Sequence, residues 1–264
     1  MPEISIQTGR IYLLDPSPEN KPAIFLLHGL GTEASSWIFQ IAALEQAGFR
    51  PVAPDLPGFG RSTYTGRRWT IRDAAKSILQ IADALTINKF HIVGISMGGT
   101  IALQTAIEYS DRLLGLILIN TFATLRPKRW NEWSYLVKRY LRARFHGAGA
   151  QAEMTARRIF PREDQKELRR ELEMHIRQTD PGVYKSAMRE LGLFDARHSL
   201  KQLSVPSLLI TGENDTTVPL ENQCELGEGL SGCRQVMIAN AGHGVIIDQP
   251  DAVNDNLLKF LQTI

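Results

Sequence analysis

The stretch IVGISMGGTIAL, residues 92–103, places a single serine, Ser96, among glycines. An apolar run rich in β-branched residues precedes the serine, and a run compatible with a helix follows it. A Gly-x-Ser-x-Gly pattern alone arises by chance in on the order of one in ten chains of this length. Its position between a strand and a helix is more specific, because that context is typical of a nucleophile held on a sharp turn. The rest of the chain decides whether Ser96 fills a turn or attacks a substrate.

The spacing of the glycines around Ser96 has a steric reason. A sharp turn at Ser96 forces its backbone into a sparsely populated conformation, and only small residues fit at Gly94 and Gly98, where neighbouring chain passes close by. The hydroxyl group then projects above the sheet, while the backbone N–H of Met97 opens a helix whose positive end faces the site. Such a turn favours a developing oxyanion.

Segments of strand and helix character alternate through the first half of the chain. Strands are expected at residues 11–15, 23–29, 50–55, 90–96 and 113–120, and helices at 37–47, 70–85 and 100–110. Strands return at 204–212 and 233–242, before a closing helix at 250–264. Several of these strands are continuous apolar runs, which is what a parallel strand covered by helices on both faces requires. The pattern predicts a doubly wound α/β sheet.

The opening residues 3–15, EISIQTGRIYLLD, have a different character. Two short extended pieces meet at Thr8-Gly9, which indicates a hairpin. An antiparallel hairpin leading into a parallel sheet makes the sheet mixed. We therefore expect a mostly parallel sheet of eight strands.

The strand signals disappear between about Thr121 and Arg197. Three segments there are helical in period and charge pattern, at residues 130–145, 151–160 and 163–178. This predicts a helical insertion at 121–197, after the sixth strand, in a core formed by 1–120 and 198–264. Basic residues are frequent in the insertion, among them Arg157, Arg158, Arg169 and Arg170. They indicate either solvated helix faces, which is the simpler interpretation, or a binding site for an anionic ligand.

Composition limits the function classes. The chain has 264 residues with 43% hydrophobic and 22% charged residues, which excludes disorder as the main interpretation. A net charge of +2 is much lower than the clustered positive charge that is typical of a protein whose main partner is a nucleic acid. Neither a signal peptide nor a membrane span is visible, so we expect a cytoplasmic protein. The two cysteines, Cys224 and Cys233, are expected to be reduced, with a disulfide or redox pair as the less favoured alternative.

With the Ser96 turn placed after an apolar strand, the chain resembles the α/β-hydrolase superfamily. That family carries a His-Gly sequence after its third strand, and here His28-Gly29-Leu30-Gly31 matches it. The resemblance implies that the N–H of Leu30 joins the N–H of Met97 in an oxyanion hole. The loop at residues 55–62, DLPGFGRS, matches a structural signature that many members carry after the fourth strand.

A nucleophilic serine needs a base and an acid. Of six histidines, His243 is the best candidate for the base, because it stands in a glycine-bordered loop between the last strand and the last helix. Asp215 follows a strand where the superfamily usually keeps its acid, and Glu213 is the close competitor. Some members place the acid one strand earlier, but this sequence has Asn120 there, which cannot serve.

The order Ser96, Asp215, His243 is the superfamily's order. The resemblance implies a serine hydrolase that cleaves carboxylic esters or lactones of small to medium molecules through an acyl-enzyme, without a metal or organic cofactor. It also implies that the insertion is a cap over the active site, where substrates are selected. Apolar and aromatic residues of the insertion could line a pocket or simply pack helices: Trp130, Trp133, Tyr135, Leu136, Phe145, Phe160 and Met188.

Several alternatives stay open at this point. A carbon–carbon bond hydrolase also uses a Ser-Met-Gly-Gly turn, although its oxyanion loop is usually richer in glycine. Cofactor-free perhydrolases share the three residues, and an acyltransferase would use them with another acceptor. A non-catalytic small-molecule-binding protein of the same fold is the alternative from another class. Ser96 argues against dehalogenases and epoxide hydrolases, which use an aspartate nucleophile. The sequence does not indicate an oligomeric state.

Overall fold

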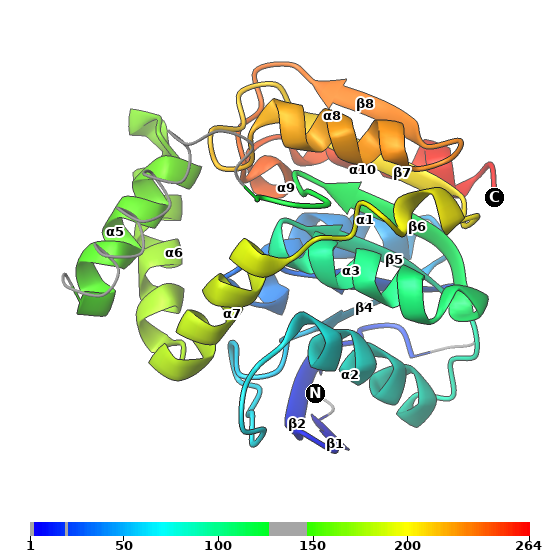
Figure 1. The fold of residues 1–264 in the computed structure, drawn as a ribbon, viewed down its shortest axis with the longest axis horizontal. Coiled ribbons are helices and arrows are strands. Elements are labelled where there is room, and N and C mark those ends of the chain that lie inside the picture. Colours follow the sequence, from blue (N-terminus) through cyan, green and yellow to red (C-terminus); the bar gives the residue numbers. More distant parts are fainter. Residues whose placement is uncertain (1–2, 19–20, 127–146) are drawn as a thin grey trace.

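An eight-stranded sheet with helices on both faces forms the centre of the protein, in a computed structural model that describes residues 3–18, 21–126 and 147–264 (Figure 1). The strand order is β1-β2-β4-β3-β5-β6-β7-β8. The strands are β1 (Glu3–Ile6), β2 (Gly9–Leu14), β3 (Ala23–Leu27), β4 (Arg50–Pro54), β5 (Phe90–Ile95), β6 (Leu113–Ile119), β7 (Ser207–Gly212) and β8 (Arg234–Ile238). The predicted fold class is confirmed.

The sheet is mixed, as the opening hairpin predicted. β1 and β2 pair antiparallel, with Glu3 opposite Tyr12, and β2 pairs antiparallel with β4. All pairs from β4 to β8 are parallel. Because parallel strands share one direction, their carboxyl ends meet at one edge of the sheet, where the loops after β3, β5, β6, β7 and β8 gather.

Helices cover both faces of the sheet. The bounds in the core are α1 (Ile38–Gln46), α2 (Ile71–Ala84), α3 (Met97–Glu108), α8 (Leu220–Gly229), α9 (Val245–Asp248) and α10 (Pro250–Leu261). Short 3-10 turns are η1 (Ala34–Trp37), η2 (Ser110–Arg112), η3 (Glu163–Gln165) and η4 (Leu200–Gln202). α2, α3 and α8 contribute to one apolar cluster, and α1, α9 and α10 contribute to the other. The sheet is therefore doubly wound.

Alternation along single strands explains how one sheet serves two cores. In β3, Phe25 and Leu27 belong to the α2–α3 side, while Ile24 and Leu26 belong to the α1–α10 side. Successive side chains of a strand point to opposite faces, so a strand covered on both faces is apolar throughout. All five residues of β3 are buried for this reason.

The described part of the insertion consists of α5 (Gly147–Ile159), α6 (Lys166–Gln178) and α7 (Pro181–Leu193), which lie beside the sheet (Figure 1). The helical segments predicted at 151–160 and 163–178 are confirmed, whereas the one at 130–145 lies outside the described residues. α7 was not predicted, although Asp180 caps its first turn and Pro181 occupies its first position, both of which are start signals.

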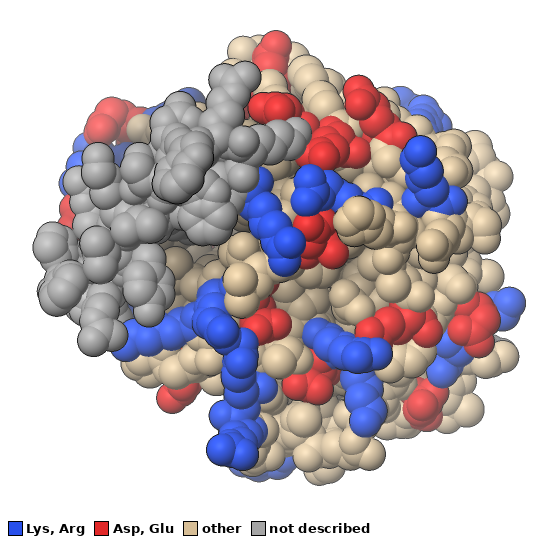
Figure 2. Space-filling model, viewed as in Figure 1, with Lys and Arg blue, Asp and Glu red and all other residues tan. Residues whose placement is uncertain are grey.

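The two ends of the insertion lie side by side, because Thr124 forms an isolated antiparallel bridge with Asp195. The division into 1–120 plus 198–264 and 121–197 stays a prediction. The described helices include none whose length and apolar character would suit it to crossing a bilayer. On the face drawn in Figure 2, basic and acidic side chains are interspersed.

Candidate active site

Ser96 occupies a strained turn between β5 and α3. Its backbone angles are φ 54° and ψ −115°, outside the regions that residues with a side chain ordinarily adopt. Two hydrogen bonds hold the turn: the Ser96 N–H donates to the carbonyl of Ile119 (3.0 Å), and the Thr121 hydroxyl donates to the carbonyl of Ser96 (2.7 Å). The expected sparsely populated conformation is present, and β6 supports it.

The glycines around the turn are required by close contacts between backbone segments. A Cβ atom at Gly94 would lie 2.2 Å from the carbonyl oxygen of Gly98, and one at Gly98 would lie 2.0 Å from that of Leu27. Neither contact can be relieved by rotating a side chain, since both partners are main-chain atoms. The turn therefore brings α3 against β5 and β3 at a distance that only glycine permits.

His243 and Asp215 lie together, although 28 positions separate them in the sequence. His243 Nδ1 is 2.9 Å from Asp215 Oδ2, and both side chains are buried. The second carboxylate oxygen, Oδ1, accepts hydrogen bonds from the backbone N–H groups of Thr217 (2.7 Å) and Val218 (3.0 Å). Gln223 Nε2 donates to Oδ2 at 3.1 Å. A carboxylate with this many donors is held in one orientation and directs the His243 ring.

Glu213, the competing acid, points elsewhere. Its side chain is exposed, and Oε2 accepts a hydrogen bond from the backbone N–H of Asn240 at 2.9 Å. Glu213 thus joins the loop after β7 to the loop after β8, while Asp215 contacts the histidine. The geometry favours Asp215 over Glu213 as the partner of His243.

Asn120 joins three strand ends, a role that the sequence did not reveal. Its side chain is buried, and Nδ2 donates to the carbonyls of Gly242 and His243, both at 2.9 Å. Its Oδ1 accepts a hydrogen bond from the N–H of Gly212 at 2.7 Å. An amide satisfies both roles because it carries a donor and an acceptor, whereas a carboxylate would only accept. The positive φ of Asn120, 44°, is a further sign of a constrained position.

The loop after β3 is ordered by a buried neutral histidine. His28 Nε2 accepts a hydrogen bond from the N–H of Leu56 at 2.9 Å, so Nδ1 carries the proton and donates to the carbonyl of Gly29 at 2.8 Å. Burial lowers the pKa of His28 to about 4, which keeps the ring uncharged at neutral pH. Leu30, two residues after His28, lines the same cavity as Ser96.

The loop at residues 55–62 supports its neighbours. Asp55 is buried and accepts hydrogen bonds from the N–H groups of Ala34 (2.7 Å) and Arg61 (2.8 Å). Burial raises the pKa of its carboxyl group, and these two hydrogen bonds oppose that shift. The loop thereby anchors the start of η1 next to the His28 segment.

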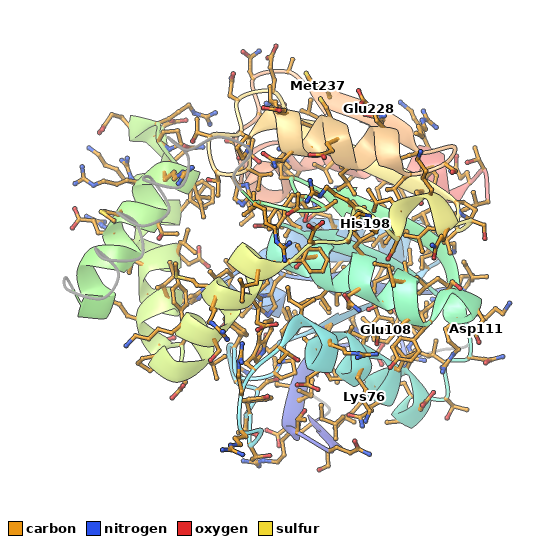
Figure 3. All side chains as sticks on the ribbon, viewed as in Figure 1. Lys76, Glu108, Asp111, His198, Glu228 and Met237 are labelled. Atoms are coloured by element: carbon orange, nitrogen blue, oxygen red, sulfur yellow. The ribbon has the colours of Figure 1, made fainter. Side chains whose placement is uncertain are left out.

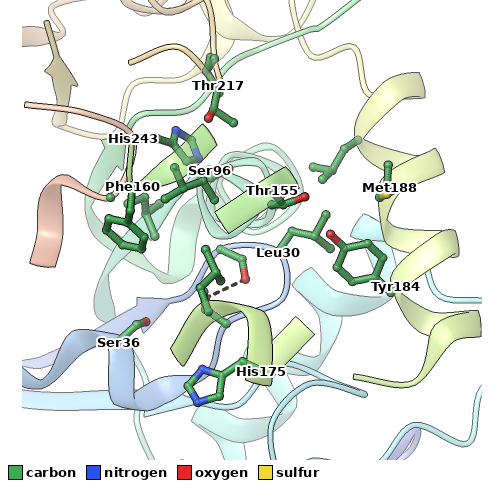
Figure 4. A pocket seen from close by; sticks show the side chains of 18 of the residues that line it. Leu30, Ser36, Ser96, Thr155, Phe160, His175, Tyr184, Met188, Thr217 and His243 are labelled. Carbon is green, nitrogen blue, oxygen red and sulfur yellow. Dashed lines mark hydrogen bonds between the residues drawn. The ribbon is translucent and has the colours of Figure 1, made fainter. Parts of the chain in front are cut away.

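A cavity of about 650 Å³ lies between the carboxyl edge of the sheet and the helices of the insertion. Ser96 and His243 line it from the core, and His175, Tyr184 and Met188 line it from α6 and α7 (Figure 4). Most of its lining side chains are apolar, and they include the predicted Phe160 and Met188. The other candidates proposed for a pocket lie outside the described residues: Trp130, Trp133, Tyr135, Leu136 and Phe145.

Further histidines and the cysteines have other surroundings. His91 is buried at the opposite end of β5, and His198 is exposed before η4 (Figure 3). Cys224 and Cys233 are free thiols, as expected. Within the described ranges, His, Cys, Asp and Glu side chains do not group in threes that could hold a metal ion.

Comparisons with known proteins agree with this architecture. A family model described as "alpha/beta hydrolase fold" matches residues 22–250. The chain is 30% identical over 255 residues to "3-oxoadipate enol-lactonase 1" of Acinetobacter baylyi, covering 94% of this chain and 91% of that protein. It is 28% identical to the "Putative carbamate hydrolase RutD" of Variovorax paradoxus, covering 94% of each.

A solved structure is also similar. The enol-lactonase from Burkholderia xenovorans superimposes with a TM-score of 0.88 at 28% identity, covering 99% of this chain and 100% of that one. The similarity therefore extends over nearly the whole length of both chains.

Proposed function

Because the chain belongs to the alpha/beta hydrolase fold family, we propose that it is a serine hydrolase that cleaves carboxylic esters or lactones of small to medium molecules. Membership and the enol-lactonase relatives identify it as a hydrolase enzyme. One observation carries the finer proposal: Ser96 on its strained turn shares a cavity with His243, whose Nδ1 is hydrogen-bonded to Asp215. These three residue types in that arrangement make a nucleophile, a base and an acid.

The proposed reaction begins at Ser96. The Asp215 carboxylate accepts a hydrogen bond from His243 Nδ1–H, so the proton stays on Nδ1 and the lone pair on Nε2 is free to take the hydroxyl proton. Ser96 Oγ then forms a bond to the carbonyl carbon, and the resulting tetrahedral intermediate collapses with loss of the alcohol, protonated by His243. Water activated by the same imidazole cleaves the acyl-serine and releases the acid.

We propose that the backbone N–H groups of Leu30 and Met97 stabilise the oxyanion. Met97 is the first residue of α3, so its N–H has no partner within the helix. The hydrogen bonds among the described residues do not use the Leu30 N–H either. Two free amides near a nucleophile, one at a positive helix end, match the demand of a developing negative charge.

The size and lining of the cavity favour ester substrates with an apolar acyl group. Its volume of about 650 Å³ exceeds what an acetyl group needs, and the charged residues lining it, Glu171, Lys185 and Arg189, are all exposed at the surface of the insertion. An apolar chain gains about 0.8 kcal/mol per buried CH₂ group in such surroundings. We propose that the residues of 121–197 form a cap that selects substrates, and that the protein acts in the cytoplasm on small molecules without a cofactor.

The first experiment measures hydrolysis of p-nitrophenyl esters from acetate to dodecanoate by the native protein and Ser96→Ala. We expect the variant to lose at least about a thousandfold in kcat/KM. Ser110→Ala, an exposed serine on η2, is the matched control and should retain full activity. Equal activity of native protein and Ser96→Ala would contradict the proposal. Parallel assays with a γ-lactone and an aryl carbamate distinguish ester cleavage from the reactions that the relatives' names describe.

A further inference from the structure

Arg158, in the last turn of α5, contacts the loop that carries Asp215. Its guanidinium donates to the carbonyl of Thr216 from Nε at 3.0 Å and from Nη2 at 2.5 Å, and more weakly to that of Thr217 at 3.5 Å. Arg157, beside it in the sequence, forms an exposed ion pair with Glu153. The two arginines therefore differ: Arg157 belongs to a solvated helix face, whereas Arg158 bridges the insertion and the core.

The Thr216–Thr217 peptide group links Arg158 to Asp215. Its carbonyl oxygen accepts from Arg158, and its N–H donates to Asp215 Oδ1 at 2.7 Å. Both ends belong to one planar, conjugated unit, so a cation bound at the oxygen makes the N–H a stronger donor. Asp215 Oδ2 in turn lies 2.9 Å from His243 Nδ1. The hydrogen bonds thus run without a break from Arg158 to His243.

Charged groups take part in the hydrogen bonds that run from Arg158 to His243, and this strengthens them. Hydrogen bonds with a charged partner are roughly twice as strong as those between neutral groups, and here the first donor is a cation and the last acceptor a carboxylate. Asp215 and His243 are almost completely shielded from solvent, which limits the screening of the bond between them, whereas the contact between Arg158 and Thr216 is exposed. Arg158 itself does not belong to the cavity lining, although Thr155 and Ile159 of the same helix do.

A second contact of the same segment reaches the His243 loop by a different route. Arg162 forms a bidentate ion pair with Asp248 on α9, at 2.7 Å and 3.3 Å. Phe160 lies against Gly244, where an added Cβ would approach its ring to 2.5 Å. These contacts anchor the insertion on α9, but they do not include Asp215.

We infer that Arg158 is a positioning residue for the reaction: through the Thr216–Thr217 peptide it holds the Asp215 carboxylate in the orientation that directs His243. This inference rests on the proposed function, because it assigns a role within the same three residues. It makes the end of α5 part of the catalytic support, in addition to any part that the insertion has in selecting substrates.

The test compares Arg158→Ala and Arg158→Lys with Arg157→Ala as the matched control. We expect kcat for p-nitrophenyl acetate to fall about tenfold in Arg158→Ala with KM within about twofold, as for loss of one charge-assisted contact. Arg158→Lys should recover most of kcat, because an ammonium group can still donate to Thr216. Arg157→Ala should match the native protein. An Arg158→Ala variant that changes KM alone would overturn the inference in favour of a role in substrate binding.

A spectroscopic measurement separates positioning from general anchoring. We expect the proton between His243 Nδ1 and Asp215 to give a low-field ¹H NMR signal in the native protein, and this signal to move upfield or broaden in Arg158→Ala. Arg162→Ala, which removes the ion pair with Asp248 on α9 and leaves the peptide contact in place, should keep that signal unchanged. Equal signals in native protein and Arg158→Ala, or equal changes in both variants, would overturn the inference. Failure of the proposed function is distinct, since native protein and Ser96→Ala would then be equally inactive.

Discussion

The loops at the carboxyl edge of the sheet and the helices of the insertion face each other across one cavity, yet they are held together by different means. The loops depend on main-chain contacts and buried hydrogen bonds, such as those of Gly98 and Asn120. The insertion depends on side chains, with a small apolar cluster that packs on the core: Ala152, Ala156, Phe160, Leu172, Ile176 and Tyr184. Reacting groups need a fixed geometry, which rigid main-chain contacts supply, whereas a substrate pocket can change with its side chains.

The two regions meet at glycines of the loops. A Cβ atom at Gly31 would lie 2.5 Å from Ile176 on α6, and one at Gly58 would lie 2.8 Å from Val183 on α7. These glycines leave room for the side chains of the insertion to reach the loops. The comparison therefore predicts large effects of small changes in the core loops and small effects of larger changes in the insertion.

The largest contrast is expected between two glycine-to-alanine substitutions. Gly98→Ala places a Cβ 2.0 Å from the carbonyl oxygen of Leu27, and we expect it to cost at least about 3 kcal/mol or to prevent folding. A Cβ atom at Gly192 in α7 would meet no atom within 4 Å. Because alanine lowers the conformational entropy of the unfolded chain, we expect Gly192→Ala to stabilise the folded protein by up to about 1 kcal/mol. Urea unfolding followed by circular dichroism measures both, and equal midpoints would contradict the comparison.

Asn120→Ala tests the buried amide that joins the strand ends. It leaves the carbonyls of Gly242 and His243 and the N–H of Gly212 without their partner, and we expect a loss of about 3 kcal/mol in the free energy of unfolding. Asn256→Ala on α10 removes a bond within one helix, to Ala252, and should change stability by less than about 0.5 kcal/mol. A cost for Asn120→Ala no greater than this control would show that the amide is dispensable.

The buried histidines of the core predict a pH dependence of stability. Burial lowers the pKa of His91 from its ordinary 6.5 to about 4, so the folded protein keeps it neutral while the unfolded chain binds a proton below pH 6.5. Stability is therefore fully present above that pH and falls toward pH 4, by up to about 1.4 kcal/mol per pH unit for this group. His91→Gln should reduce the slope of unfolding free energy against pH, and an unchanged slope would refute this assignment.

The smallest effect on the chemistry is expected from Met188→Trp. Met188 lies across the cavity from Ser96 in Figure 4, so added bulk there should shorten the space for an acyl chain. We expect the rate ratio of octanoate to acetate esters to fall about tenfold, comparable to the burial of two CH₂ groups, with acetate hydrolysis nearly unchanged. Met174→Trp, exposed on α6 outside the cavity lining, is the control. The same ratio in both variants would contradict this placement.

Most of the fold followed from local patterns. Apolar runs indicated the strands, helical periods indicated α2 and α3, and Gly94 and Gly98 indicated the turn at Ser96, because each of these features depends on neighbours a few residues away. α7 was missed because its sequence mixes apolar, polar and glycine residues, so its period is weak, although Asp180 and Pro181 mark its start. The role of Asn120 could not be predicted, since its partners are 92, 122 and 123 positions away.

The sequence by itself determined the α/β class, the turn that carries Ser96 and the identity of the candidate reacting residues, because local sterics and chain order specify them. Only the tertiary structure decided which oxygen of Asp215 meets His243, how Asn120 joins three strand ends and how Arg158 reaches the same carboxylate through a peptide group. These are contacts between segments far apart in the chain. Such contacts form only when the chain folds, and they leave no periodic pattern in the sequence from which they could be predicted.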